Sequence, residues 1–106
     1  MIITELMKSN KQPPIHPGEI LLEDFMKPAG ISGNALALAL RVPVTRINAI
    51  VNEARGISAD TALRLGRYFS TTPEFWMNLQ ARFDLDVAAD ASAAEIELSV
   101  RPRSAA

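Results

Sequence analysis

The stretch LALALRVPVTRINAIV, residues 36–51, decides the fold of this chain. Its apolar residues would fit one continuous helix of about four to five turns if Pro43 were absent. Proline lacks a backbone N–H, and its ring collides with the carbonyl of the preceding turn, so Pro43 prevents such a helix. We therefore predict two short helices that meet at a sharp turn, with the second running from Pro43 to about Asn52.

The apolar positions of this stretch match a helix-turn-helix motif. Two helices that cross steeply need a small residue at their contact, and Ala37 meets that need. They also need apolar residues after the turn and on the inner face of the second helix, which Val42, Ile47 and Ile50 provide. The inner side of the first helix is completed by Leu36 and Leu40. The alternative is an ordinary helical hairpin whose polar face contacts only water.

The outward face of the second helix suits the major groove of DNA, because its side chains are small or polar. This face, Arg46 at its side and the loop after the helix provide seven candidate DNA-binding residues: Val44, Thr45, Arg46, Asn48, Ala49, Asn52 and Arg55. In a groove about 12 Å wide, Thr45 can contact a thymine methyl group and Asn48 can pair with adenine. Arg46 can contact a guanine edge or a phosphate. Asn52 and Arg55 lie at the far end of the helix, where phosphates are the expected contacts.

Cap residues and prolines divide the rest of the chain into helices, so we expect an all-α, compact five-helix domain. Pro17 suits the first position of a helix capped by His16, and Pro28 is expected to end this helix. Serine and threonine are good N-caps, and they predict where three further helices begin. These caps are Ser32, Ser58 and Thr72.

The chain divides into a flexible N-terminal arm over residues 1–14, the helical domain over 15–94 and a C-terminal tail over 95–106. In the tail, Ile96, Leu98 and Val100 alternate with polar residues. A period of two suggests a short strand. Because an otherwise helical chain offers it no partner, this strand would pair with a second copy, or the segment is simply a tail.

Composition favours one small, folded, non-enzymatic domain. The chain has 106 residues, of which 48% are hydrophobic and 22% charged, which is typical of a globular protein. It has no cysteine and a single histidine, and no catalytic or phosphate-binding motif occurs, so we expect no cofactor, metal site or enzyme activity. No long apolar run or signal peptide is apparent, which indicates a soluble cytoplasmic protein.

Charge is distributed unevenly along the chain. Residues 41–67 contain five arginines against two acids, a net charge of +3, whereas residues 74–97 contain six acids against Arg82, a net charge of −5. A polarised protein can present its basic face to phosphates while another surface meets a different, basic partner. The alternative is that the charges cluster by chance, and that these side chains contact only water.

Residues from about Ile15 to Val87 resemble the HigA antitoxin family, within the repressor-type (XRE) helix-turn-helix class. The stretches that carry the resemblance are HPGEILLEDF, GIS, LALALRV, TRINAIV, ISADTALRLGRYF and TPEFWMNLQARFDL. The resemblance implies an all-helical homodimer that binds a palindromic double-stranded DNA operator before its own operon and represses it. It also implies a cognate toxin, HigB, similar to the RelE-type mRNA interferases. The recognition residues it carries over are Val44, Thr45, Arg46, Asn48 and Asn52.

Two positions depart from the usual pattern of the family. Arg41 occupies a turn position where glycine or asparagine is common, and a positive φ there would cost about 1–2 kcal/mol. Gly33 stands where a polar residue, often glutamine, would reach a phosphate. The loss of this contact predicts weaker or more partner-dependent DNA binding, while neither departure changes the expected fold.

Large apolar residues in the fifth helix exceed what a domain of this size needs for closure. We expect part of this cluster to form a dimer interface; its members are Phe75, Trp76, Leu79 and Phe83. The alternative is that these side chains belong to the core. Two other functional hypotheses stay open: a free-standing regulator without a toxin, and an interaction module that has lost DNA binding.

Overall fold

A computed structural model describes residues 13–104 as an all-α fold, as predicted. The first helix is continuous through three segments: α2 (Pro17–Ile20), the π-helical η1 (Leu21–Met26) and α3 (Lys27–Ala29). His16 caps it as expected, because its Nδ1 accepts a hydrogen bond from the N–H of Gly18 at 2.9 Å. Most of the predicted arm, residues 1–12, lies outside the described part.

The prediction that Pro28 ends the first helix is wrong. Lys27 has helical angles, φ −64° and ψ −49°, and the helix continues to Ala29. The N–H of Lys27 donates to the carbonyl of Leu22, five residues earlier, so the turn before the proline is wider than an α-helical turn. A wider turn relieves the clash between a proline ring and the preceding carbonyls. The chain leaves the helix only at Gly30, whose φ is 64°.

The helix-turn-helix motif is formed by α4 (Gly33–Leu40) and α5 (Val44–Val51). The hydroxyl of Ser32 caps α4 by accepting from the N–H of Ala35 at 3.1 Å. Arg41 ends α4 in the left-handed region, with φ 60° and ψ 46°, so the strain expected at this position is present. Pro43 lies one residue before α5, at the N-cap position, and turns the chain into it.

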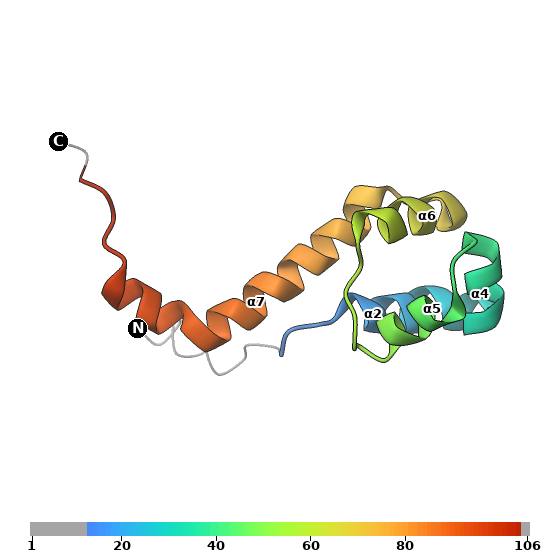
Figure 1. Cartoon of the computed structure of the whole chain (residues 1–106), viewed down its shortest axis with the longest axis horizontal. Helices are drawn as coiled ribbons and strands as arrows, with labels where there is room; N and C mark the ends of the chain where they lie inside the picture. The colour runs from blue at the N-terminus through green and yellow to red at the C-terminus, as the bar shows by residue number, and fades with distance from the viewer. Residues whose placement is uncertain (1–12, 105–106) are drawn as a thin grey trace.

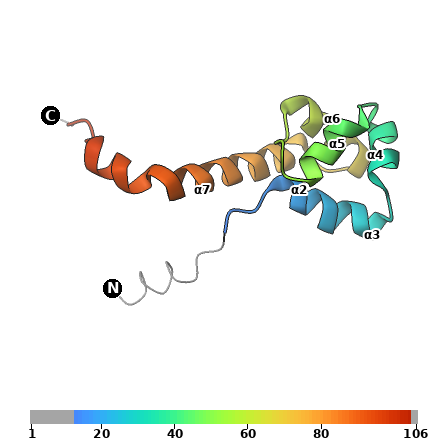
Figure 2. The same cartoon turned by 60° about the horizontal axis from the view of Figure 1, so that its bottom comes forward.

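Two further helices complete the domain, α6 (Ala59–Phe69) and α7 (Pro73–Ser99), with Ser58 and Thr72 as their N-caps. Gly66 allows the turn between them to approach α6 closely. A Cβ at this position would lie 3.1 Å from the backbone of Thr71 and of Pro73. In Figures 1 and 2, α7 begins against the other helices and then extends away from them.

The fifth helix is longer than predicted, and the predicted strand is absent from the described residues. Residues 95–99 belong to α7, and the N–H of Val100 still donates to the carbonyl of Ile96 at 2.8 Å. A single strand would leave its backbone groups unpaired, whereas the alanine-rich segment 88–94 favours continued helix. None of the helices in residues 13–104 is both long enough and apolar enough to cross a membrane.

The core lies between η1, α4, α5, α6 and the start of α7. Its buried apolar side chains are Leu21, Met26, Leu36, Ala37, Leu40, Ile47, Ile50, Ile57, Ala62, Leu65 and Trp76. Trp76, predicted to lie at a dimer interface, is instead fully buried within one chain. Its ring packs on Phe25, with centroids 4.8 Å apart, and its Nε1 donates to the hydroxyl of Thr71 at 2.8 Å. Within this chain Trp76 is therefore a core residue, which is the alternative stated for this cluster.

Candidate nucleic-acid interface

The outward face of α5 is polar and exposed, as the sequence predicts. Thr45, Asn48 and Asn52 are exposed and lie at spacings of three and four residues, so they share one side of the helix and its C-terminal end. Val44 and Ala49 are half-buried, and Val44 also packs against the core. These residues present one narrow polar strip with small neighbours, a shape that a major groove can admit.

Arg46 does not share that strip. Its Nη1 lies 2.6 Å from Oδ2 of Asp60, at the start of α6, and only 23% of its side-chain surface is exposed. Arg46 could reach a base edge or a phosphate only by leaving this carboxylate. Arg55, in contrast, is exposed in the loop after α5.

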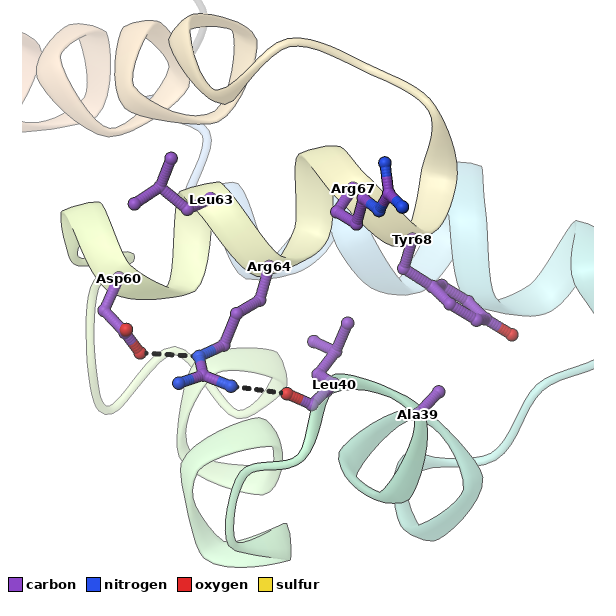
Figure 3. Close-up of a pocket in the computed structure, with 7 residues that line it drawn as sticks. All are labelled: Ala39, Leu40, Asp60, Leu63, Arg64, Arg67 and Tyr68. Carbon is purple, nitrogen blue, oxygen red and sulfur yellow. Dashed lines mark hydrogen bonds and ion pairs between the residues drawn. The ribbon is translucent and has the colours of Figure 1, made fainter.

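Asp60 also binds Arg64, which connects α6 to the end of α4. Nε of Arg64 donates to the same Oδ2 of Asp60 at 2.9 Å, and its Nη1 donates to the carbonyl of Leu40 at 2.9 Å (Figure 3). That carbonyl lies in the last turn of α4, where helical partners run out. The hydrogen bonds from Arg64 and then from Arg46 lower the pKa of Asp60 below its ordinary value of 3.8. Asp60 is therefore an ionised carboxylate that connects α5 and α6.

Gly33 lies directly beside the predicted base-contacting residue Asn48. A Cβ at position 33 would lie 3.1 Å from Oδ1 of Asn48 and 3.9 Å from Ile47. The first turn of α4 therefore contacts the exposed face of α5. Any larger residue at position 33 would have to displace the Asn48 amide, so the glycine at this position shapes the surface around a candidate base contact.

Gly18 supports α5 from behind. A Cβ on Gly18 would overlap the carbonyl oxygen of Ile50 and lie 2.8 Å from its carbonyl carbon. The backbones of α2 and α5 are thus in direct contact, and only glycine fits between them. The sequence contained a signal for this contact, because Gly18 lies inside a helix and no turn requires it.

The loop after α5 is held by α7. The N–H of Ile57 donates to Oε1 of Gln80 at 2.6 Å, and Nε2 of Gln80 donates to Asp84 at 3.0 Å. A Cβ on Gly56 would lie 2.7 Å from the same Oε1, so this glycine admits the amide. Gln80 and Ile57 are 23 residues apart, and no local pattern in the sequence predicts the pair.

A shallow pocket lies between α4 and α6, on the side of the Asp60 and Arg64 pair (Figure 3). It is lined by Ala39, Leu40, Asp60, Leu63, Arg64, Arg67 and Tyr68. The only carboxylate in this lining already accepts hydrogen bonds from two arginines and is not free to act as a general base. Within residues 13–104, no group of three or more histidine, cysteine, aspartate or glutamate side chains is placed to hold a metal ion.

Known proteins are similar to this chain in both sequence and overall fold. The virulence-associated protein I of Dichelobacter nodosus is 57% identical over 79 residues, which cover 74% of this chain and 73% of the relative. The antitoxin HigA of Pseudomonas aeruginosa, solved with higBA promoter DNA, is 53% identical with a TM-score of 0.82, over 84% of this chain and 97% of that one. The chain belongs to the HigA family of helix-turn-helix proteins.

Antitoxin HigA-1 of Vibrio cholerae serotype O1 is a further HigA relative, 35% identical over 79 residues, or 74% of each chain. No family model matches the chain. The predicted resemblance to HigA is thus confirmed by whole-domain similarity. The two positions expected to depart from the HigA pattern lie at the ends of α4, where Gly33 faces α5 and Arg41 adopts the left-handed conformation.

Proposed function

We propose that this protein is an antitoxin that binds, as a homodimer, a palindromic operator before its own operon and represses transcription. The observation that carries the proposal is the exposed polar strip of Thr45, Asn48 and Asn52 on a helix-turn-helix whose P. aeruginosa HigA relative was solved with promoter DNA. Because the target is DNA of the cell's own operon, the protein would act in the cytoplasm.

Each residue of the strip has a chemical role in this proposal. The N-terminal end of α5 enters the major groove, where Thr45 contacts a thymine methyl group and Asn48 pairs with adenine. Val44 and Ala49 are small enough to let the helix approach the bases. Asn52 and Arg55, at the opposite end, contact phosphates and fix the orientation of the helix.

The dimer would use the surface of α7 that one chain leaves uncovered. Phe75 is 37% exposed, whereas Leu79 packs against the core and Phe83 contacts the ring of His16, with centroids 4.8 Å apart. Beyond these residues α7 carries a shallow apolar groove, lined by Leu85, Ala88, Ala89, Ala93, Ile96 and Glu97. Burial of such a stripe against a second copy would remove apolar surface from water. Sedimentation as a monomer at micromolar concentration would contradict the dimer.

The partner of the antitoxin would be a HigB-like toxin related to the RelE-type mRNA interferases. The exposed part of α7 and its end are acidic, with Asp84, Asp86, Asp90, Glu95 and Glu97 and no basic residue between positions 83 and 99. An acidic surface favours a basic protein partner. Copurification of a small basic protein encoded in the adjacent reading frame supports this assignment; an adjacent frame of another kind favours a free-standing regulator.

Selection of bound duplexes from a random DNA pool tests the DNA-binding part directly. Enrichment of a two-fold symmetric site, with affinity that falls steeply between about 50 and 200 mM salt, is the expected result for a dimeric repressor. No enrichment, either for the protein alone or with its copurified partner, would favour an interaction module that has lost DNA binding.

A further inference from the structure

We propose that Asp60 is a specificity-determining residue, which holds Arg46 against α6 and so keeps a cation out of sequence-independent contact with DNA. The inference rests on the proposed DNA-binding function and assigns a role to a residue outside the helix-turn-helix motif. Its basis is the 2.6 Å pair between Nη1 of Arg46 and Oδ2 of Asp60.

The position of Arg46 makes this pair consequential. Arg46 is the third residue of α5, at the end that carries Thr45 and faces the proposed groove. A free arginine there would find a phosphate beside almost any DNA sequence, and each such contact adds affinity without discrimination. The carboxylate of Asp60 offsets part of the charge of Arg46, since the group formed with Arg64 keeps a net charge of +1, and 77% of the side-chain surface of Arg46 is covered.

Asp60 is itself fixed, so it cannot follow Arg46 towards DNA. Its Oδ2 also accepts from Nε of Arg64, whose Nη1 is bound to the carbonyl of Leu40 in α4. Figure 3 shows this chain of contacts from Asp60 through Arg64 to Leu40. Arg64 therefore holds the carboxylate independently of Arg46, and Arg46 can reach bases and phosphates only if it gives up a short charged hydrogen bond.

The discriminating variant is Asp60→Asn, which removes the charge but keeps the shape of the side chain. The matched control is Glu23→Gln, since Glu23 is paired with Lys27 at 2.8 Å on the first helix, away from α5, and the net charge changes equally. Each protein is titrated with the operator duplex obtained by selection and with an unrelated duplex of the same length, from about 50 to 200 mM salt.

We expect Asp60→Asn to bind the unrelated duplex about eightfold more tightly near 100 mM salt, with a salt slope steeper by about 0.9, as for one added phosphate contact. Affinity for the operator should change less, so the ratio of specific to unrelated binding falls. Addition of Arg46→Gln to Asp60→Asn should remove the gain. In the otherwise unchanged protein, Arg46→Gln should leave the salt slope as it is.

Three results would overturn the inference. In the first, Asp60→Asn gains no affinity for the unrelated duplex: it matches Glu23→Gln on both duplexes, or it loses affinity for both together with thermal stability. Asp60 would then have only a structural role. In the second, Arg46→Gln alone has a lower salt slope than the unchanged protein, which would mean that Arg46 already contacts phosphate. If Asp60→Asn does not fold, this single variant still tests whether Arg46 is kept away from phosphate. If the unchanged protein binds neither duplex, the proposed function fails as well, and that result is distinct from the other two.

Discussion

Replacement of Gly18 by alanine should destabilise the domain at the contact that supports α5. The added Cβ would overlap the Ile50 carbonyl oxygen, so the backbones of α2 and α5 must move apart. Overpacking of this kind costs about 1–3 kcal/mol, and the better helix propensity of alanine recovers less than about 1 kcal/mol. We expect a net loss of about 2 kcal/mol, which for a domain of this size lowers the melting temperature by roughly 8–16 °C.

Thermal unfolding followed by circular dichroism, at one protein concentration, measures this loss. Gly33→Ala is the matched control, because its Cβ would meet only the flexible end of Asn48, at 3.1 Å. The control should melt within about 2 °C of the unchanged protein, as surface substitutions usually do. Equal melting temperatures for Gly18→Ala and Gly33→Ala would refute this reasoning. The loss of stability in Gly18→Ala would then not come from the backbone contact between α2 and α5.

Three other outcomes follow from the geometry. Arg41→Gly should relieve about 1–2 kcal/mol of left-handed strain, less roughly 0.5–1 kcal/mol for the greater freedom of glycine in the unfolded chain, so the urea midpoint should rise slightly. Asn48→Ala should leave unfolding unchanged but cost about 1–3 kcal/mol of discrimination for the operator, measured by competition with a duplex mutated at one adenine. The pKa of Asp60 is lowered in the folded protein, so Asp60 contributes its full stabilisation at pH values above its ordinary pKa of 3.8. This stabilisation is lost as the pH falls from there through the lower pKa of the folded state. The melting temperatures of Asp60→Asn and the unchanged protein should therefore converge in acid and diverge above pH 4–5; a difference independent of pH would contradict this assignment.

Local chemistry was sufficient to predict the helix-turn-helix motif. Pro43 forbids one continuous helix, Ala37 permits a close crossing, and the inner positions Ile47 and Ile50 are fully buried as expected. The N-caps are also local features, since a serine or threonine hydroxyl reaches a backbone N–H only three residues away. Patterns of this kind operate within one or two turns and can be recognised in a single sequence.

The predictions that were wrong have two causes. Some depended on residues distant in the chain, and others on competition between local signals. Alternation from Ile96 to Val100 resembled a strand, but residues 13–104 contain no second strand to pair with it, and the helix continues. Pro28 stayed helical because the turn before it widened. A tryptophan suits an interface as well as a core, and the packing of Trp76 against Phe25 and Phe69, from other helices, places it in the core. The pairing of Arg46 with Asp60 spans 14 residues and has no periodic signature.

The contact of Gly18 with Ile50 and the hydrogen bond from Ile57 to Gln80 make the two-helix motif a poor candidate for transplantation. A graft of residues 32–52 onto another scaffold would lack Gly18, which allows α5 to pack closely on α2. It would also lack Gln80, which accepts a hydrogen bond from the loop after α5. Chimeras with altered operator preference should therefore exchange only the exposed side chains of α5 and keep everything from Gly18 to Gln80 as one piece. The smallest segment that could be transferred with its DNA-binding surface intact is therefore nearly the whole domain.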